Sequence, residues 1–80
     1  MNYKWYVEGW KGLDCVGWFY VVYTASLPAR ANRLVLDMHA DRVYVRPTDS
    51  SRQRFGFAAA YFANGRWTVV DPKLEMLKGE

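Results

Sequence analysis

The sequence has few of the residues that build metal sites and disulfide frameworks. Its 80 residues include a single cysteine, Cys15, and a single histidine, His39. One cysteine cannot form an internal disulfide, so no oxidising compartment is implied. A structural zinc site takes four ligands, which these two residues cannot supply. We therefore expect no metal and no cofactor.

Long apolar runs are also missing. The longest, CVGWFYVVYTASL (15–27), is shorter than the roughly 20 residues that a membrane-spanning helix needs. The first ten residues, MNYKWYVEGW, lack the basic segment and apolar run of a signal peptide. We expect a soluble, intracellular protein of the cytoplasm with no membrane partner.

Signatures of catalysis are absent from the sequence as well. It contains no glycine-rich phosphate loop, and its acidic residues are scattered rather than paired. A nucleophile pair of Cys15 and His39 is disfavoured, because Cys15 lies in an apolar stretch typical of a core and His39 in a polar one. The sequence predicts a protein that is not an enzyme.

Aromatic residues, in contrast, are abundant. The chain has 4 Trp, 6 Tyr and 4 Phe, and 51% of its residues are hydrophobic. Each buried ring removes roughly 150–250 Å² from water, and a chain this short builds only a small core. The rings exceed what that core can hide, so we expect several on the surface. Exposed rings in a group typically mark a binding patch.

The chain is mildly basic and rich in arginine. The formal net charge is +3, and every basic residue from Arg30 to Arg66 is an arginine. The guanidinium group binds carboxylate and phosphate in a forked geometry and stacks on rings. This pattern indicates either a partner with an acidic or phosphorylated surface or a solvated basic face.

The first part of the chain predicts a hairpin followed by a helix. Residues 2–8 alternate as a half-buried strand, 9–14 contain two glycines and predict a turn, and 15–24 are apolar on both faces, as in a central strand. Residues 26–40 are predicted to form a helix with an apolar stripe, in which Ser26 is the N-cap. The residues of that stripe are Leu27, Ala31, Leu34, Val35 and Met38, with Leu36 pointing away. The alternative is a β-hairpin over 33–47.

The second part predicts a strand over 42–47, a polar loop over 48–54 and a second hairpin around Asn64-Gly65, which is a strong hairpin signal. A short helix over 72–78 follows Asp71. The expected fold is a small single α+β domain over 1–80, with an antiparallel sheet of about five strands and one or two helices. If 33–47 is a hairpin, the alternative is an all-β sheet or barrel of six strands.

The run Arg54-Phe55-Gly56-Phe57 resembles part of the aromatic octapeptide of RNA-recognition-motif domains, which implies rings that stack on bases. The sequence departs from that motif at Ala58 and Ala60, and the hairpin that follows replaces the family's helix. The other interpretation is that the small residues lie under a closely packed helix.

The best basic cluster is the loop RPTDSSRQR (46–54) together with the neighbouring hairpin. The residues predicted to bind a partner are Arg46, Arg52, Arg54, Arg66 and Trp67. Loops on rigid scaffolds often carry function.

These features favour a non-catalytic protein that occludes a partner's surface through rings and arginines. Such a chain is similar in general character to small phage-encoded inhibitors of host defence, such as anti-CRISPR proteins. The implied partner is a protein complex with an acidic or nucleic-acid-handling surface. The alternatives are a domain that binds single- or double-stranded nucleic acid directly and a self-assembling subunit, for example a homodimer.

Overall fold

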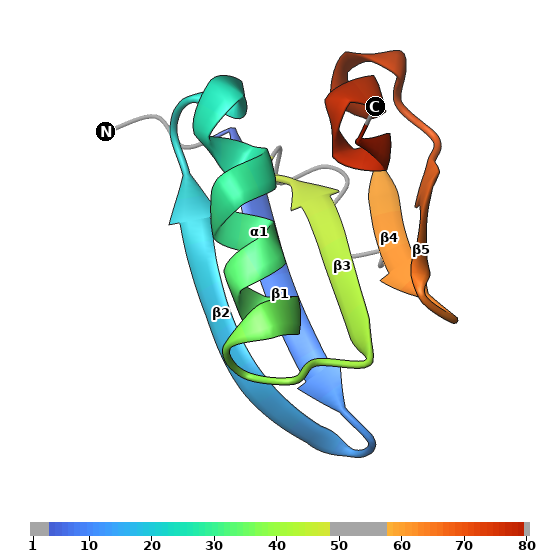
Figure 1. Cartoon of the computed structure of the whole chain (residues 1–80). Helices are drawn as coiled ribbons and strands as arrows, with labels where there is room; N and C mark the ends of the chain where they lie inside the picture. The colour runs from blue at the N-terminus through green and yellow to red at the C-terminus, as the bar shows by residue number, and fades with distance from the viewer. Residues whose placement is uncertain (1–3, 49–57, 80) are drawn as a thin grey trace.

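The computed structural model describes residues 4–48 and 58–79. A five-stranded antiparallel sheet carries one α-helix against one of its faces (Figure 1). In chain order the elements are β1 (Trp5–Lys11), β2 (Asp14–Val21), the 3-10 helix η1 (Thr24–Ser26), α1 (Leu27–Leu36), β3 (Arg42–Pro47), β4 (Ala60–Ala63), β5 (Arg66–Val69) and the 3-10 helix η2 (Pro72–Lys78). The strands lie side by side in the order β2-β1-β3-β4-β5. The predicted α+β sheet is confirmed, and the six-stranded alternative is not found because residues 27–36 are helical.

The turn between β1 and β2 is shorter than predicted. Strand β1 continues through Gly9 and Trp10, and only Gly12 and Leu13 form the turn. The prediction of a turn over 9–14 was wrong because it treated both glycines as turn residues. Gly12 does have the left-handed φ of 62° that a tight turn requires. Gly9 instead lies in the strand, where it leaves room for the helix.

Helix α1 packs its apolar stripe on the sheet as predicted. Leu27, Ala31 and Leu34 are buried, whereas Leu36 is 73% exposed. The helix ends before Met38, whose side chain is exposed rather than part of the stripe. Across the interface, the buried strand residues are Val7, Val21, Val43, Val45 and Ala60. Ala60 is therefore a core residue, whereas Ala63 at the other end of β4 is half-buried on the opposite face of the sheet.

Ser26 stands at the N-cap position of α1 but does not cap it. Its hydroxyl donates a hydrogen bond to the Tyr23 carbonyl at 2.8 Å, which closes the turn that leads into the helix. Nearby, the indole N–H of Trp5 donates to Thr24 Oγ1 at 3.0 Å. These two bonds fix the connection between β2 and α1.

Strand β2 was predicted to be central, and this was wrong. It pairs with β1 on one side and forms an edge of the sheet within the described residues. Its apolar residues do not all enter a core, since Trp18 and Tyr20 are exposed on the side of the sheet opposite α1. Cys15 is also exposed, although its apolar neighbours predicted a core position.

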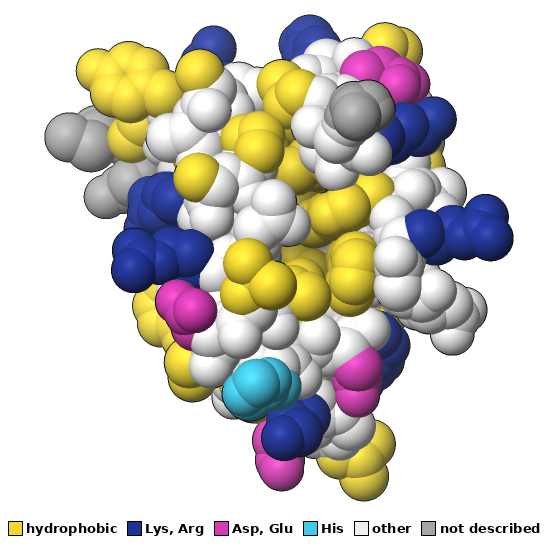
Figure 2. All heavy atoms as spheres, in the orientation of Figure 1, with side chains coloured by type: hydrophobic (Ala, Val, Ile, Leu, Met, Phe, Trp, Pro, Cys, Tyr) yellow, Lys and Arg dark blue, Asp and Glu magenta, His cyan; other side chains and the backbone are white. Residues whose placement is uncertain are grey.

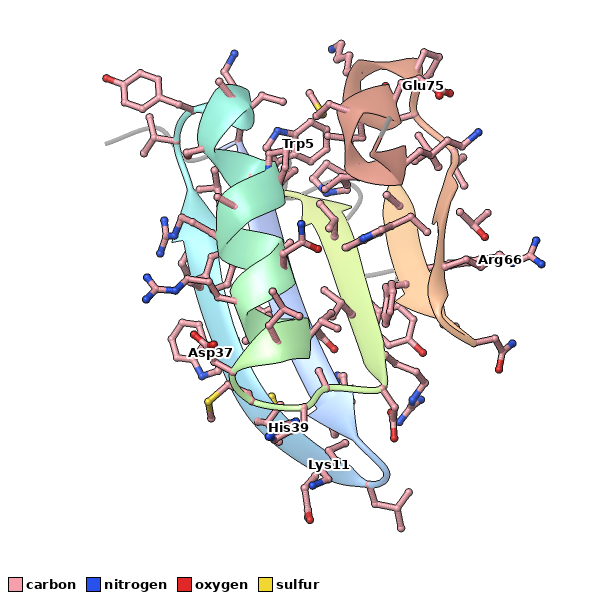
Figure 3. The ribbon with its side chains drawn as sticks, in the orientation of Figure 1. Trp5, Lys11, Asp37, His39, Arg66 and Glu75 are labelled. Atoms are coloured by element: carbon pink, nitrogen blue, oxygen red, sulfur yellow. The ribbon has the colours of Figure 1, made fainter. Side chains whose placement is uncertain are left out.

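The second hairpin and the terminal helix agree with the sequence. Asn64 and Gly65 both have positive φ angles, 55° and 77°, as a two-residue hairpin turn requires. Asp71 caps η2, with its carboxylate accepting from the Lys73 N–H at 3.0 Å. Helix η2 packs on β5 and adds Leu74 and Leu77 to the core. In Figure 3, Trp5 lies between α1 and η2.

Replacing Gly9 by alanine should destabilise the protein by about 1–3 kcal/mol, because overpacking strains a well-filled core. A Cβ at Gly9 would lie 3.1 Å from Leu34 Cδ1 and 3.3 Å from Leu34 Cβ, so α1 must shift to accept it. The control Leu36→Ala should change the unfolding free energy by less than about 0.5 kcal/mol. Urea denaturation followed by circular dichroism measures both, and equal stabilities would contradict this packing.

Candidate binding surface

The sheet has one face without a helix among the described elements, and we call it the open face. Side chains alternate along each strand, so the residues between the buried valines point away from α1. The open face consists of Tyr6, Glu8 and Trp10 of β1, Trp18 and Tyr20 of β2, Arg42, Tyr44 and Arg46 of β3, Tyr61 of β4, and Arg66 and Thr68 of β5. Rings and arginines therefore make up most of this surface.

The rings at the β1–β2 end of the open face are in mutual contact. The centroids of Tyr6 and Tyr20 are 5.3 Å apart, and those of Trp18 and Tyr20 are 6.1 Å apart in an edge-to-face arrangement. Such pairs hold one another in place. Trp18 remains 60% exposed and Tyr20 42% exposed. Of the rings in the described ranges, Trp5 alone is fully buried, in agreement with the predicted surplus.

Arginines of β3 lie over the ring of Tyr44. The guanidinium of Arg46 is 5.1 Å from the ring centroid and that of Arg42 is 6.0 Å from it. Arg42 also donates to the Tyr44 hydroxyl at 3.2 Å and to the Gly12 carbonyl. Cation–π contact stabilises an arginine near a ring, so both guanidinium groups lie close to Tyr44.

Arg46 also lines a small pocket of about 250 Å³ with Tyr6, Glu8 and Tyr20. Its Nη1 atom is buried and has no hydrogen-bond partner in the part of the chain that the structure describes. A buried donor without an acceptor costs about 1–3 kcal/mol.

Glu8 supplies the acidic group of the open face. Its carboxylate accepts a hydrogen bond from the Trp10 indole N–H at 2.7 Å. Burial raises the pKa of Tyr6, and the neighbouring Glu8 carboxylate raises it further. The Tyr6 hydroxyl therefore stays protonated at physiological pH and can act as a hydrogen-bond donor.

The predicted site residues fall in different places. Arg46 and Arg66 both lie on the open face. Arg66 pairs with Ala63 of β4, and Ala63 pairs with Arg42 of β3, so Arg66 lies level with Arg42 and not with Arg46. Arg46 is four residues further along β3, roughly 13 Å away at about 3.3 Å per residue. In Figure 3 the Arg66 side chain extends from β5 away from the sheet.

Trp67 lies on the other side of β5 from Arg66. Its ring packs on Phe62, 5.5 Å between centroids, and both are half-buried against the core. Figure 2 shows hydrophobic side chains gathered in the strip between α1 and the elements that follow β3. Arg52 and Arg54 lie outside the described residues, as do Phe55 and Phe57, so their predicted roles stay predictions.

Sequence reasoning missed the rings that dominate the open face. Tyr6, Trp18, Tyr20, Tyr44 and Tyr61 were not among the predicted binding residues. A signal for Tyr44 was present, because in β3 Arg42, Tyr44 and Arg46 alternate with Val43 and Val45. The sequence does not show on which face of the sheet the helix lies.

The remaining chemical candidates do not form a site in the described ranges. Cys15 Sγ contacts the Gly17 carbonyl at 3.7 Å, and His39 is exposed with a φ of 59°. Residues 4–48 and 58–79 contain no group of three or more side chains suited to hold a metal ion. Within the same residues, no helix is long and apolar enough to traverse a bilayer.

Comparisons of the chain with family models, curated proteins and solved structures return no significant match. The surface must therefore be interpreted from its own geometry.

Truncating the exposed and buried tryptophans should have very different effects on stability. Trp18→Ala removes a ring that is 60% exposed, so the unfolding free energy should fall by no more than about 1 kcal/mol. Trp5→Ala removes a ring that is 6% exposed and should cost about 3–5 kcal/mol. Denaturant titrations compare the two variants, and a similar loss in both would mean that the open face is part of a core.

Proposed function

We propose that this chain is a non-catalytic binding protein that occupies a partner's surface with the open face. The observation that carries the proposal is the arrangement of exposed and half-buried rings beside sheet-bound arginines, opposite the helix that closes the core. A rigid sheet presents these side chains at little cost in conformational entropy.

The residue types suit a protein interface. Tryptophan, tyrosine and arginine are the side chains that most often dominate binding energy, especially near the centre of a contact. Trp18 and Tyr20 offer the apolar area, and Arg46 at the neighbouring pocket offers a cation. A carboxylate on the partner suits such a guanidinium group.

This mode of action agrees with the inhibitor role predicted from the sequence. An inhibitor that blocks a nucleic-acid-handling complex acts by covering part of that complex with one of its faces. It needs no catalytic group of its own. The arginines of the open face match the acidic surface expected of such a partner.

A second candidate is direct binding of nucleic acid, and the charge of the open face favours it. Among the described residues of this face, Arg42, Arg46 and Arg66 are cations and Glu8 is the carboxylate, while Arg42 also pairs with the neighbouring Asp41 at 3.6 Å. Glu8 is itself engaged by Trp10. Rings next to cations can stack on bases while the cations contact phosphates.

Trp18→Ala and Arg46→Ala should each weaken the complex with the partner by about 30-fold or more, as expected for central hot-spot residues. The partner is first recovered from a cell lysate on tagged wild-type protein and then titrated by calorimetry. Nuclease treatment of the lysate separates the candidates, because a protein partner is retained and a nucleic-acid partner is lost.

Leu36→Ala is the matched control, since Leu36 is 73% exposed but lies on α1. It should leave the affinity unchanged. Full affinity in both open-face variants, or an equal loss in the control, would place the binding surface elsewhere.

A further inference from the structure

Strand β2 has the composition of a central strand but occupies an edge. It is eight residues long, and Asp14 at its start is its single charged residue. Natural sheets usually protect such an edge with lysine, proline or strong distortion, because its free backbone groups pair readily with another strand. On β2, Arg30 Nη1 donates a hydrogen bond to the Tyr20 carbonyl at 3.3 Å.

The side chains around this edge are also suited to contact. On the open face, Trp18 and Tyr20 are exposed. On the helix side, β2 and α1 enclose a groove of about 270 Å³, whose lining residues are Phe19, Arg30, Arg33, Leu34, Asp37 and Met38. The groove is apolar in its middle and charged along α1.

The order of the charged residues along the groove depends on the direction of α1 relative to β2. The Arg30 guanidinium lies 4.4 Å from the Phe19 ring, near the end of β2, while Leu34 packs at Gly17. Helix α1 therefore runs antiparallel to β2, and Asp37 falls toward the beginning of β2, on the β2 side of the helix (Figure 3). Arg30 lies at one end of the groove and Asp37 at the other, and Arg33 between them pairs with Asp37, 3.5 Å from Nε to Oδ2.

This order is self-complementary under two-fold symmetry. If two β2 strands pair antiparallel, the arginine end of each copy meets the Asp37 end of the other. A parallel arrangement would instead bring like charges together. With the axis at Trp18, the large Phe19 of one copy lies opposite the small Gly17 of the other, and the two Trp18 rings form a cross-strand pair.

We propose that a second copy of this chain pairs antiparallel along β2, around Trp18, and joins the two sheets into one. The two open faces then form a continuous surface, which doubles the area of rings offered to a partner. The pairing does not depend on the proposed function, since it uses the backbone of β2 and the groove beside α1.

Sedimentation of the full chain from micromolar to millimolar concentration should show a monomer–dimer equilibrium. Asp37→Arg should weaken the dimer by about tenfold or more, because it replaces two symmetric attractions by two repulsions. Asp37 is 62% exposed, so the fold should be retained. Mixing this variant with Arg33→Glu should restore pairing, since the reversed charges then face each other.

Glu75→Arg is the matched control, with the same change of charge at a similarly exposed position on η2, beyond the opposite edge of the sheet. It should leave the dimer unchanged. Amide hydrogen exchange should also slow in residues 14–21 as concentration rises, because pairing protects the edge.

A monomer at every concentration would overturn the proposal. So would a dimer that Asp37→Arg leaves intact, or one in which the exchange of β2 amides does not slow, because pairing would then use another surface. The proposed function is tested separately through the partner affinity of Arg46→Ala, because Arg46 lies on β3 and Trp18 belongs to the pairing strand itself.

Discussion

The contact of Leu34 with Gly9 and Gly17 determines how the rest of the molecule is arranged. A Cβ at Gly17 would lie 2.7 Å from Leu34 Cδ2 and one at Gly9 3.1 Å from Leu34 Cδ1, so the two glycines leave room for the Leu34 side chain between α1 and the sheet. This close approach places α1 over β1 and its neighbours, and it buries the valines that alternate with the rings. The described residues contain one α-helix, so among them the other face of the sheet has no second layer.

The uneven use of the two faces accounts for the surplus of rings. The helix side is filled by Val, Leu and Ala, with Trp5 as its fully buried ring. The other side carries tyrosines, Trp18 and the β3 arginines, which stabilise one another by ring and cation–π contacts. The proposed binding role depends on the same physics, because exposed rings gain free energy when they are covered.

Much of the fold could be predicted from local signals. Asn64-Gly65 defined its hairpin because both positions need positive φ, and the stripe from Leu27 to Leu34 defined α1. Glycine was harder to interpret, since Gly12 serves a turn and Gly9 a helix contact, and composition does not separate these roles. The edge position of β2 was also hidden, because an apolar strand looks the same whether its neighbour is its own chain or another. For the candidate site, arginines were predicted as binding residues. The exposed rings could not be predicted, because their exposure depends on which face of the sheet the helix covers.

The most direct test of this account is the reactivity of individual rings toward hydroxyl radicals in the free protein. If the open face is uncovered, Trp18 and Tyr20 should be oxidised several-fold faster than Trp5, which is 6% exposed. Mass spectrometry of the digested chain measures each rate in one sample. Protection of Trp18 equal to that of Trp5 would show that the open face is sealed, and it would contradict the view that this protein acts through it.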